Sequence, residues 1–270
     1  TFISTKVLIN HGLTPQEIFF YRFLIAYTGI WVISPKRLFT GNWKDELWLV
    51  AGGIFGGSLY FFTENTALGI TQASNVSFII CTAPLLTTIL SLLFYKSEKA
   101  SKGLIYGSLL ALMGVGLIVF NGSFVLKISP IGDLLTLLAA LSWAFYSLII
   151  KKMAGRYPTV FITRKIFFYG VLTILPAFLL HPLQPDTAVL LQPGVLFNLL
   201  FLAVLASLIC YVLWNVVLKQ LGTVRASNYI YLNPLVTMIA SSLILDEKIT
   251  LVALGGAACI VCGVYWAEKK

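Results

Sequence analysis

Charged residues are scarce in this sequence, and so are the residue types from which metal and nucleotide sites are usually built. Asp, Glu, Lys and Arg together make up 11% of its 270 residues, compared with about 25% in a soluble domain. The sequence has only two histidines, His11 and His181, and it contains neither HExxH nor GxxxxGKS/T. Metal hydrolysis and nucleotide-driven chemistry are therefore not indicated, and we expect no cofactor and no metal site.

Cysteine is also sparse, and its placement argues against a disulfide framework. The four cysteines, Cys81, Cys210, Cys259 and Cys262, all lie inside apolar runs. We therefore interpret the closely spaced pair Cys259 and Cys262 as helix-packing residues rather than as a redox or metal site.

Long apolar runs dominate the rest of the sequence. Hydrophobic residues account for 59% of the chain, the mean hydropathy is +0.91, and about 20 apolar residues suffice to span a bilayer as a helix. The composition predicts an all-α membrane protein with ten transmembrane helices. We expect them at 1–11, 15–34, 47–68, 72–95, 103–121, 131–150, 158–180, 194–218, 224–245 and 250–267. The opening TFISTKVLIN is shorter than a span and lacks the charged leader of a signal peptide, so we expect the sequence to begin inside its first helix.

The basic residues are distributed in a way that predicts the orientation in the membrane. The net charge is +9, but these residues occur in short clusters between apolar runs, so no nucleic-acid partner is indicated. Most of the 19 Lys and Arg residues fall in the segments after the second, fourth, sixth and eighth predicted helices and at the C-terminus; only Lys127 and Lys248 fall in the opposite loops. By the positive-inside rule, both termini are cytoplasmic. We expect a multi-pass protein of the bacterial inner membrane.

The two halves of the sequence share residues at nearly constant offsets. At a spacing of 150, Asn65, Ser77, Pro84 and Thr87 match Asn215, Ser227, Pro234 and Thr237. At a spacing of 143, Phe2, Ser4, Gly12, Pro15 and Arg22 match Phe145, Ser147, Gly155, Pro158 and Lys165; at 149, Glu98, Lys99, Gly107 and Gly114 match Glu247, Lys248, Gly256 and Gly263. We therefore divide the chain into repeats at 1–122 and 123–270. Because each repeat would have five spans, an odd number, the second would be inverted, as in many secondary transporters.

With these features the sequence resembles the EamA-type transporters of the drug/metabolite transporter superfamily. The resemblance covers nearly the whole chain. It rests on TFISTKVLI at the start, SNVSFIICTAPLLTTILSLLFYKSEK, and its second-half partner RASNYIYLNPLVTMIASSLILDEK, which is followed by a glycine-rich final helix. It implies a ten-helix inverted-repeat fold, alternating access and export of small metabolites, with amino acids the best-known cargo of bacterial relatives. Compared with that family, the first helix is truncated at its N-terminal end.

One acidic residue, Glu64, lies among the long apolar helices. A carboxylate in hydrocarbon costs about 2.5–3.5 kcal/mol on insertion scales, so such a residue is a candidate functional group. Tyr60 precedes it by four residues and shares its helix face. Glu64 could bind a substrate ammonium or exchange a proton; alternatively, it could pair with Lys6 or Arg22. Lys6 could also bind a substrate carboxylate.

The remaining basic residues inside predicted helices have a simpler interpretation. Arg22, Arg164 and Lys165 are near helix ends, where long side chains reach to the interface, and we expect them to do so.

Polar and aromatic residues on several predicted helices share faces and predict a central cavity. On the sixth helix these are Trp143 and Tyr146, and on the eighth Tyr211, Trp214 and Asn215. The fourth helix contributes Asn75, and the ninth contributes Asn228 and Tyr231. Any one of these residues, taken alone, could instead be a packing residue. Pro84 and Pro234 should kink the fourth and ninth helices and form a hinge pair. The glycines of GGIFGG, at 52–57, and of the fifth helix predict close helix packing.

We therefore expect a secondary transporter, not an enzyme, that exports amino acids or related small metabolites. Its substrate-binding residues would be Glu64, Tyr60, Lys6, Asn75, Trp143, Tyr146, Trp214, Asn215, Asn228 and Tyr231. Its partners would be membrane lipids, the substrate and a proton, and it would be a monomer or a homodimer. The alternatives are an uncoupled facilitator, an exporter of other metabolites or drugs, and a membrane enzyme acting on lipid-linked substrates. The last would need several acids or histidines at one membrane face.

Overall fold

A computed structural model describes residues 1–35, 39–95, 101–120, 129–180, 182–183, 187–236, 238–239 and 250–268, and every regular element in these ranges is helical. The first half contains α1 (Phe2–Asn10), α2 (Pro15–Ile33), α3 (Trp43–Gly53), η1 (Ile54–Ser58), α4 (Leu59–Ile70), α5 (Ala73–Ile80), α6 (Ala83–Phe94) and α7 (Lys102–Phe120). The second half contains α8 (Pro130–Ala154), α9 (Thr159–Ile174), α10 (Ala177–Leu180), α11 (Thr187–Leu190), α12 (Pro193–Leu200), η2 (Phe201–Ile209), α13 (Cys210–Leu221), α14 (Thr223–Asn228), η3 (Tyr229–Leu232) and α16 (Leu251–Glu268).

The helix starts follow from local sequence signals. Thr14 and Glu17 form a capping box at the start of α2, whose first residue is Pro15, and Asn42 caps α3 through the amide of Lys44. Proline also begins α8 and α12, where its missing amide proton costs nothing. Most helices predicted from hydropathy agree with the structure to within a few residues. The helix predicted at 224–245 falls partly outside the described residues. Lys127 and Lys248 lie outside them altogether.

Two long helices contain a π-helical segment. Between Trp43 and Ile70 the chain is continuously helical, and η1 is its wider middle turn; η2 occupies the same place between Pro193 and Leu221. In η1 the carbonyl of Phe55 accepts a hydrogen bond of 2.8 Å from Ser142, and that of Gly56 accepts one from Tyr211. Side chains of α8 and α13 therefore bind carbonyls of the π turn.

The two prolines predicted as a hinge pair follow irregular turns of their helices. α5 ends at Ile80, and Pro84 lies in the first turn of α6. Before Pro234 the helix does not break, but it narrows to the 3-10 turn η3, which ends at Leu232. A proline ring clashes with the backbone one turn earlier, which accounts for the position of both irregularities.

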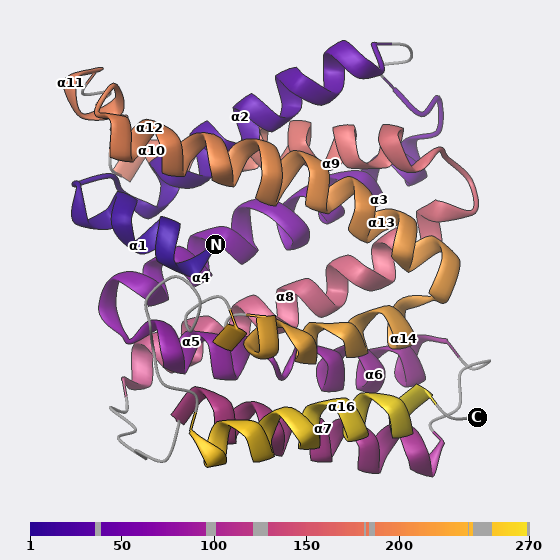
Figure 1. Cartoon of the computed structure of the whole chain (residues 1–270). Helices are drawn as coiled ribbons and strands as arrows, with labels where there is room; N and C mark the ends of the chain where they lie inside the picture. Colours follow the sequence, from indigo (N-terminus) through magenta and orange to yellow (C-terminus); the bar gives the residue numbers. More distant parts are fainter. Residues whose placement is uncertain are drawn as a thin grey trace.

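The helices run side by side across the molecule (Figure 1). α2 and α9 lie at one end of the stack, α4 and α8 near its middle, and α7 and α16 together at the other end. Glycines allow the closest approaches. A Cβ at Gly53 would lie 2.5 Å from Cβ of Tyr169 on α9, and one at Gly114 would lie 2.5 Å from the carbonyl oxygen of Gly256 on α16. The predicted close packing at these glycines is confirmed.

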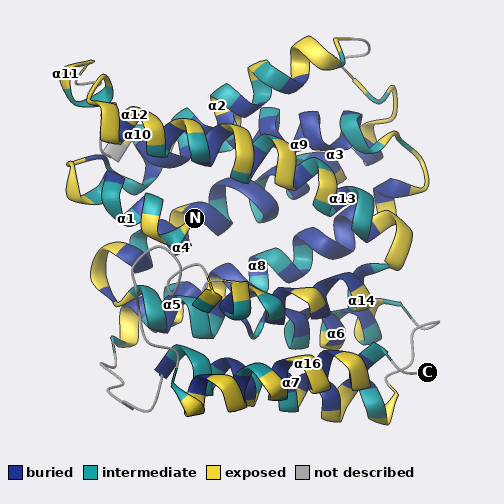
Figure 2. Ribbon diagram, in the orientation of Figure 1, coloured by how far each residue is buried: buried dark blue, intermediate teal, exposed yellow. Residues whose placement is uncertain are grey.

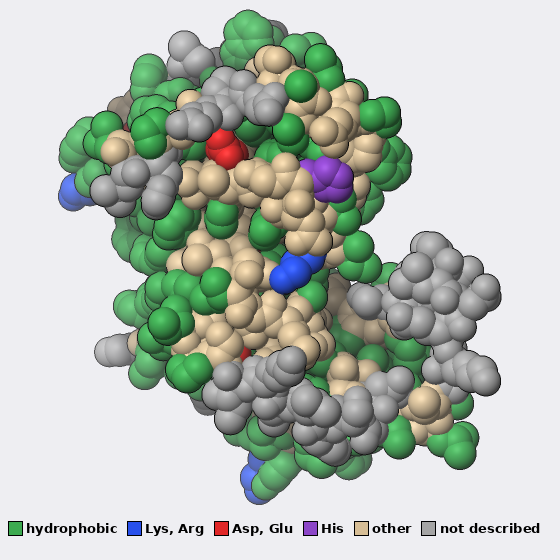
Figure 3. All heavy atoms as spheres, turned by 90° about the vertical axis from the view of Figure 1, so that its left-hand side faces the viewer, with side chains coloured by type: hydrophobic (Ala, Val, Ile, Leu, Met, Phe, Trp, Pro, Cys, Tyr) green, Lys and Arg blue, Asp and Glu red, His purple; other side chains and the backbone are tan. Residues whose placement is uncertain are grey.

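The outer surface is apolar. Large hydrophobic side chains such as Phe94, Met113, Leu134 and Tyr265 are exposed, and exposed residues line the outer sides of helices (Figure 2). Hydrophobic side chains cover much of the face in Figure 3, on which charged ones are few. Among the described residues, six helical stretches are long and apolar enough to cross a membrane: Ala73–Phe94, Lys102–Phe120, Pro130–Ala154, Thr159–Leu179, Pro193–Leu221 and Leu251–Glu268. The chain is a multi-pass membrane protein.

Candidate functional site

Glu64 is buried in the interior of the molecule and bonded to its neighbour on α4. Its side chain is 4% exposed, and one carboxylate oxygen accepts a hydrogen bond of 2.7 Å from the hydroxyl of Tyr60. The spacing of four residues places both groups on one helix face. The predicted juxtaposition of Glu64 and Tyr60 is confirmed.

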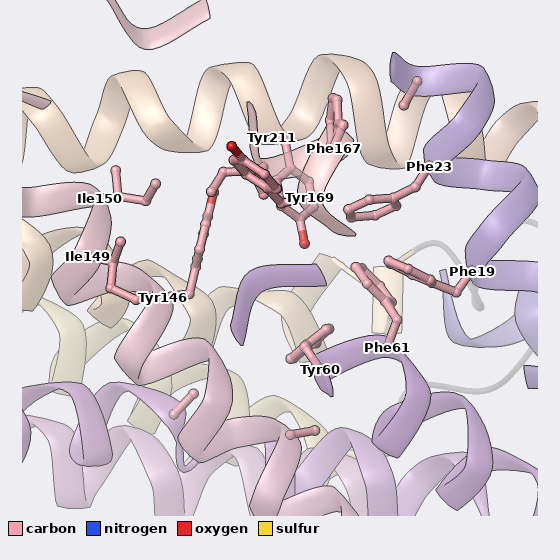
Figure 4. Close-up of a cluster of buried hydrophobic side chains, with 14 of the residues drawn as sticks. Phe19, Phe23, Tyr60, Phe61, Tyr146, Ile149, Ile150, Phe167, Tyr169 and Tyr211 are labelled. Atoms are coloured by element: carbon pink, nitrogen blue, oxygen red, sulfur yellow. The ribbon is translucent and has the colours of Figure 1, made fainter. Parts of the chain in front are cut away.

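Aromatic rings from four helices converge beside this pair. Trp143 on α8 contacts Tyr60, Tyr146, Tyr211 and Trp214, with ring centroids 5.1–5.9 Å apart. Figure 4 shows Phe23 of α2 and Phe61 of α4 on one side of Tyr211 and Tyr146 of α8 on the other. We call Tyr60, Phe61, Trp143, Tyr146, Tyr211 and Trp214 the aromatic cluster. The cluster joins predicted site residues of α4, α8 and α13 in the largest hydrophobic core of the described chain.

Arg22 is buried next to this cluster, and the prediction that its side chain reaches the interface is wrong. The side chain is 1% exposed. Its Nε donates a hydrogen bond of 2.9 Å to Ser207 in η2, and its guanidinium lies 4.2 Å from the centroid of the Phe61 ring. Cation–π contacts of this kind are strongest when desolvated. A π segment of the second half of the chain thus holds a cation of the first half.

Two further features of Arg22 bear on ligand binding. Its Nη1 is buried without a hydrogen-bond partner. The guanidinium of Arg22 lies close enough to the carboxylate of Glu64 for the two charges to interact. Among the described residues, however, no ion pair within 4.0 Å joins the two side chains. A buried donor without a partner is costly, so this nitrogen is a candidate ligand contact.

Tyr146 of the cluster begins a series of hydrogen bonds, and two indole donors of the cluster are left without partners among the described residues. Tyr146 donates to Asn215 at 2.7 Å, and the amide of Asn215 donates to Thr163 on α9 at 2.9 Å. The indole nitrogens of Trp143 and Trp214 are buried without partners. The hydrogen bonds through Asn215 orient Tyr146. The two indole nitrogens could donate to a bound ligand.

The other predicted site residues lie apart from the aromatic cluster or have different contacts. Lys6 on α1 donates a hydrogen bond of 2.6 Å to the carbonyl of Leu68, in the last turn of α4, where a cation also complements the helix dipole. Tyr231 belongs to another core, built around α7 and α16. Asn75 and Asn228 are buried, and both amide atoms of Asn228 lack partners.

Arg164 and Lys165 are also buried, contrary to expectation, because partners surround them at the start of α9. They are 1% and 3% exposed. Lys165 pairs with Glu46 on α3, and Tyr169 donates to the same carboxylate oxygen, while Arg164 donates to the backbone of Ser34. These bonds join α3, α9 and the segment after α2.

Glu46 lies in the first turn of α3, before its apolar part. Burial raises the pKa of this carboxyl, but hydrogen bonds from Lys165, Tyr169 and Thr40 outweigh burial and lower it to about 2. Its carboxylate is therefore charged at every physiological pH, and we assign it a structural role.

Two contributors to this site, Phe61 and Ser207, are absent from the predicted residues. Arg22 is predicted either as a partner of Glu64 or as a side chain at the interface, but its hydrogen-bond partner Ser207 is 185 residues away in the sequence. Tyr211 was named only for sharing a face with Trp214. Its contacts with Phe23, Tyr146 and Phe167 place it at the centre of the cluster. In the sequence, the only signal for Tyr211 is its spacing from Trp214 and Asn215, which places the three residues on one helix face.

A family profile decides the class of this protein. The profile of the EamA-like transporter family matches residues 1–120 and again residues 130–267. The chain belongs to this family. Its members are transporters, and the prediction that the protein is not an enzyme is confirmed.

Relatives and a solved structure agree along almost the whole chain. An "Uncharacterized transporter" of Archaeoglobus fulgidus is 29% identical, over 100% of this chain and 93% of its own length. Proteins named "Probable amino-acid metabolite efflux pump" are 27% identical in Salmonella typhimurium and 24% identical in Escherichia coli, each over 98% of this chain and 88% of the relative. A crystal structure with 18% identity has a TM-score of 0.75 and covers 99% of this chain and 93% of that one, so the two share a fold.

Proposed function

We propose that this EamA-like transporter exports zwitterionic amino acids or closely related metabolites across a bacterial inner membrane by alternating access. The observation that carries this proposal is the pair of opposite charges, Arg22 and Glu64, buried beside the aromatic cluster. An amino acid carries both a carboxylate and an ammonium group. Arg22 would bind the carboxylate through Nη1, and Glu64 would bind the ammonium with Tyr60 as its neighbour.

Aromatic rings complete this proposed site. Apolar pockets with a few convergent polar groups hold small molecules, and stacked or edge-on rings prefer other planar groups. Trp143, Tyr146, Tyr211 and Trp214 would contact the side chain of the substrate, and Asn215 would fix the position of Tyr146. The efflux-pump names of two relatives also support an amino-acid substrate.

The architecture we propose is ten transmembrane helices in two inverted repeats, 1–122 and 123–270, with both termini cytoplasmic. Contacts that exchange equivalent helices of the two halves support it. α2 packs on η2, and α9, its counterpart by sequence, packs on η1 and α3. Arg22 correspondingly reaches Ser207 in η2, and Lys165 reaches Glu46 on α3.

Glycine contacts between α7 and α16 support the same symmetry. Gly107 and Gly114 match Gly256 and Gly263 in the sequence repeat. In the structure, a Cβ on Gly114 would meet Gly256, and one on Gly263 would meet the carbonyl of Gly107 at 2.5 Å. Such reciprocal contacts are characteristic of two-fold related elements. Pro84 and Pro234 would be hinges in equivalent helices, and Asn75, Asn228 and Tyr231 would line the path in another conformation.

The test is transport of labelled amino acids by purified protein in proteoliposomes. Wild type should show saturable uptake of at least one of Phe, Trp, Thr and Met. Glu64→Gln should weaken competition by the amino acid more than competition by its analogue without the amine. Arg22→Gln should instead weaken competition by the analogue without the amine more strongly, because it removes the carboxylate contact. Arg22→Lys should partly restore that competition. Lys219→Gln, an exposed substitution on α13, is the control. Equal effects of both variants on competition by the amino acid and by its analogue without the amine would refute the two-point site.

A proton is the second proposed partner, because the side-chain hydrogen bond that Glu64 accepts within the described part of the chain comes from the neutral hydroxyl of Tyr60. An imposed pH gradient should drive uptake in wild type but not in Glu64→Gln. Unchanged pH dependence in that variant would exclude Glu64 as the proton site. Saturable counterflow without any response to the gradient would favour an uncoupled facilitator.

A further inference from the structure

A concave site lies on the outer side of the bundle, and its lining includes neither Glu64 nor any residue of the aromatic cluster. Residues of α3, η1, α6 and α8 line a pocket of about 470 Å³, which is within the range of small-molecule sites, about 300–1,000 Å³. Phe55, Phe94 and Phe145 form much of its wall, with the rings of Phe55 and Phe145 5.2 Å apart. Phe94 is 65% exposed, so the pocket opens sideways, toward the position of lipid tails.

Cations and amphipathic rings border one end of this pocket. Lys151 and Lys152 occupy the last turn of α8. The ammonium of Lys152 lies 3.7 Å from the ring centroid of Trp48, and that of Lys151 lies 4.2 Å from that of Tyr95. Tryptophan, tyrosine and lysine are enriched at the membrane interface. The border therefore lies at the level of lipid headgroups, and the apolar wall lies deeper.

Two acidic residues of α3, among those the structure describes, already have other partners. On α3, Asp45 accepts from Arg156 at 2.6 Å and from Tyr157 at 2.9 Å, and Glu46 is paired with Lys165. Within the described residues, no carboxylate forms an ion pair with Lys152, which is exposed. The charge of Lys152 is thus available to an anion arriving from the membrane side.

We propose that this pocket binds an anionic phospholipid of the surrounding bilayer. One acyl chain would occupy the apolar part, and the phosphate would contact Lys152. Basic pockets between transmembrane helices recognise anionic headgroups in this way. A slender chain fits a pocket between three helices better than the broad face of a second copy would. The transported substrate requires convergent polar groups, whereas the rings of this wall are apolar.

Native mass spectrometry of the purified full chain tests this proposal. Protein in mild detergent is mixed with phosphatidylglycerol or with phosphatidylcholine of the same acyl chains. Wild type should retain more phosphatidylglycerol. Lys152→Glu should weaken that retention at least about five-fold, and the matched control Lys219→Glu, also an exposed lysine near a helix end, should not. Lys152→Gln replaces the reversal if the latter cannot be purified.

A second pair of variants tests the apolar part of the pocket. Ala51→Phe places a ring in the pocket and should reduce retention of both lipids, whereas Ala258→Phe, on the exposed face of α16, should reduce neither. Equal retention of the two lipids by wild type, or equal loss in Lys152→Glu and Lys219→Glu, would overturn the proposal. Dimer peaks that disappear in Ala51→Phe would assign the pocket to a second copy instead and would also overturn it.

Discussion

Two pairs of charged residues in this protein differ in how their charges are compensated. Lys165 and Glu46 form an ion pair whose remaining hydrogen-bonding groups are used by Tyr169 and Thr40. Among the described residues, Arg22 instead donates one side-chain hydrogen bond to Ser207, and Glu64 accepts one from Tyr60; both partners are neutral hydroxyls. A buried charge needs compensation, so the first pair suits a permanent structural role and the second suits a partner that comes and goes.

We expect Glu46→Gln to destabilise the protein strongly. The Glu46 and Lys165 side chains are 13% and 3% exposed, and removing one partner of a buried pair costs about 3–5 kcal/mol. Asp45→Asn is the comparison. The side chain of Asp45 is 6% exposed, but that of its partner Arg156 is 54% exposed and stays hydrated when the pair is lost, so we expect a smaller loss than for Glu46→Gln. Thermal unfolding in detergent, followed by tryptophan fluorescence, measures both. Equal losses would contradict the assignment of Glu46.

Acid should remove the same stabilisation. The pKa of Glu46 is about 2 in the folded protein and about 4.3 in an unfolded chain. A lowered pKa stabilises the folded state above the unfolded value, and this contribution is lost as the pH falls toward the folded value. The difference in melting temperature between wild type and Glu46→Gln should therefore be constant above about pH 5 and should shrink between about pH 4.5 and pH 2. A difference that grows on acidification would contradict this.

At the scale of elements, the two π segments place residues that the site requires. A π turn offsets the side chains that follow it and leaves carbonyls to outside donors. In η1 those donors are Ser142 and Tyr211, and Tyr211 is the central ring of the aromatic cluster. In η2 the segment contains Ser207, which binds Arg22. Each π segment therefore connects its helix to the proposed binding site.

Gly56→Ala should disrupt this arrangement. A Cβ there would lie 2.6 Å from ring atoms of Tyr146, and overpacking of this kind costs about 1–3 kcal/mol. Gly69→Ala on α4 is the control, because a Cβ there meets nothing within 4 Å and alanine favours the helix by about 0.5–1 kcal/mol. Melting temperature should fall in the first variant and stay level or rise in the second. Loss of transport in the first should accompany the shift of Tyr146.

The sequence predicted the helices well because the length and spacing of apolar runs depend only on local composition. It placed Tyr60 beside Glu64 for the same reason, since their spacing is one helical turn. Burial of Arg22 and Lys165 could not be predicted, because it depends on Ser207 and Glu46, which are far away in the sequence. The π segments were missed as well, since their carbonyls are satisfied by side chains from other helices.

At the scale of the whole molecule, the proposed inverted repeat accounts for two sets of contacts. It makes α7 and α16 counterparts that pack on each other, and it makes the contact of α2 with η2 equivalent to the contact of α9 with η1. Reciprocal glycine contacts bring α7 and α16 together at one edge of the bundle (Figure 1). The crossed contacts of α2 and α9 join the two halves around the site. A rocking motion about the site would therefore have to preserve the first pairing and rearrange the second.

Membrane sidedness tests this arrangement as a whole. In a variant with the four native cysteines replaced, single cysteines are introduced at exposed sites: Gly155 and Lys219 after predicted inward-ending helices, and Gly69 and Gln192 after predicted outward-ending ones. A membrane-impermeant maleimide added to intact spheroplasts should label only the cysteines at 69 and 192, and after lysis it should label all four. In the inverted repeat, Gly69 and Lys219 occupy equivalent positions at a spacing of 150, so labelling both from the same side would refute it.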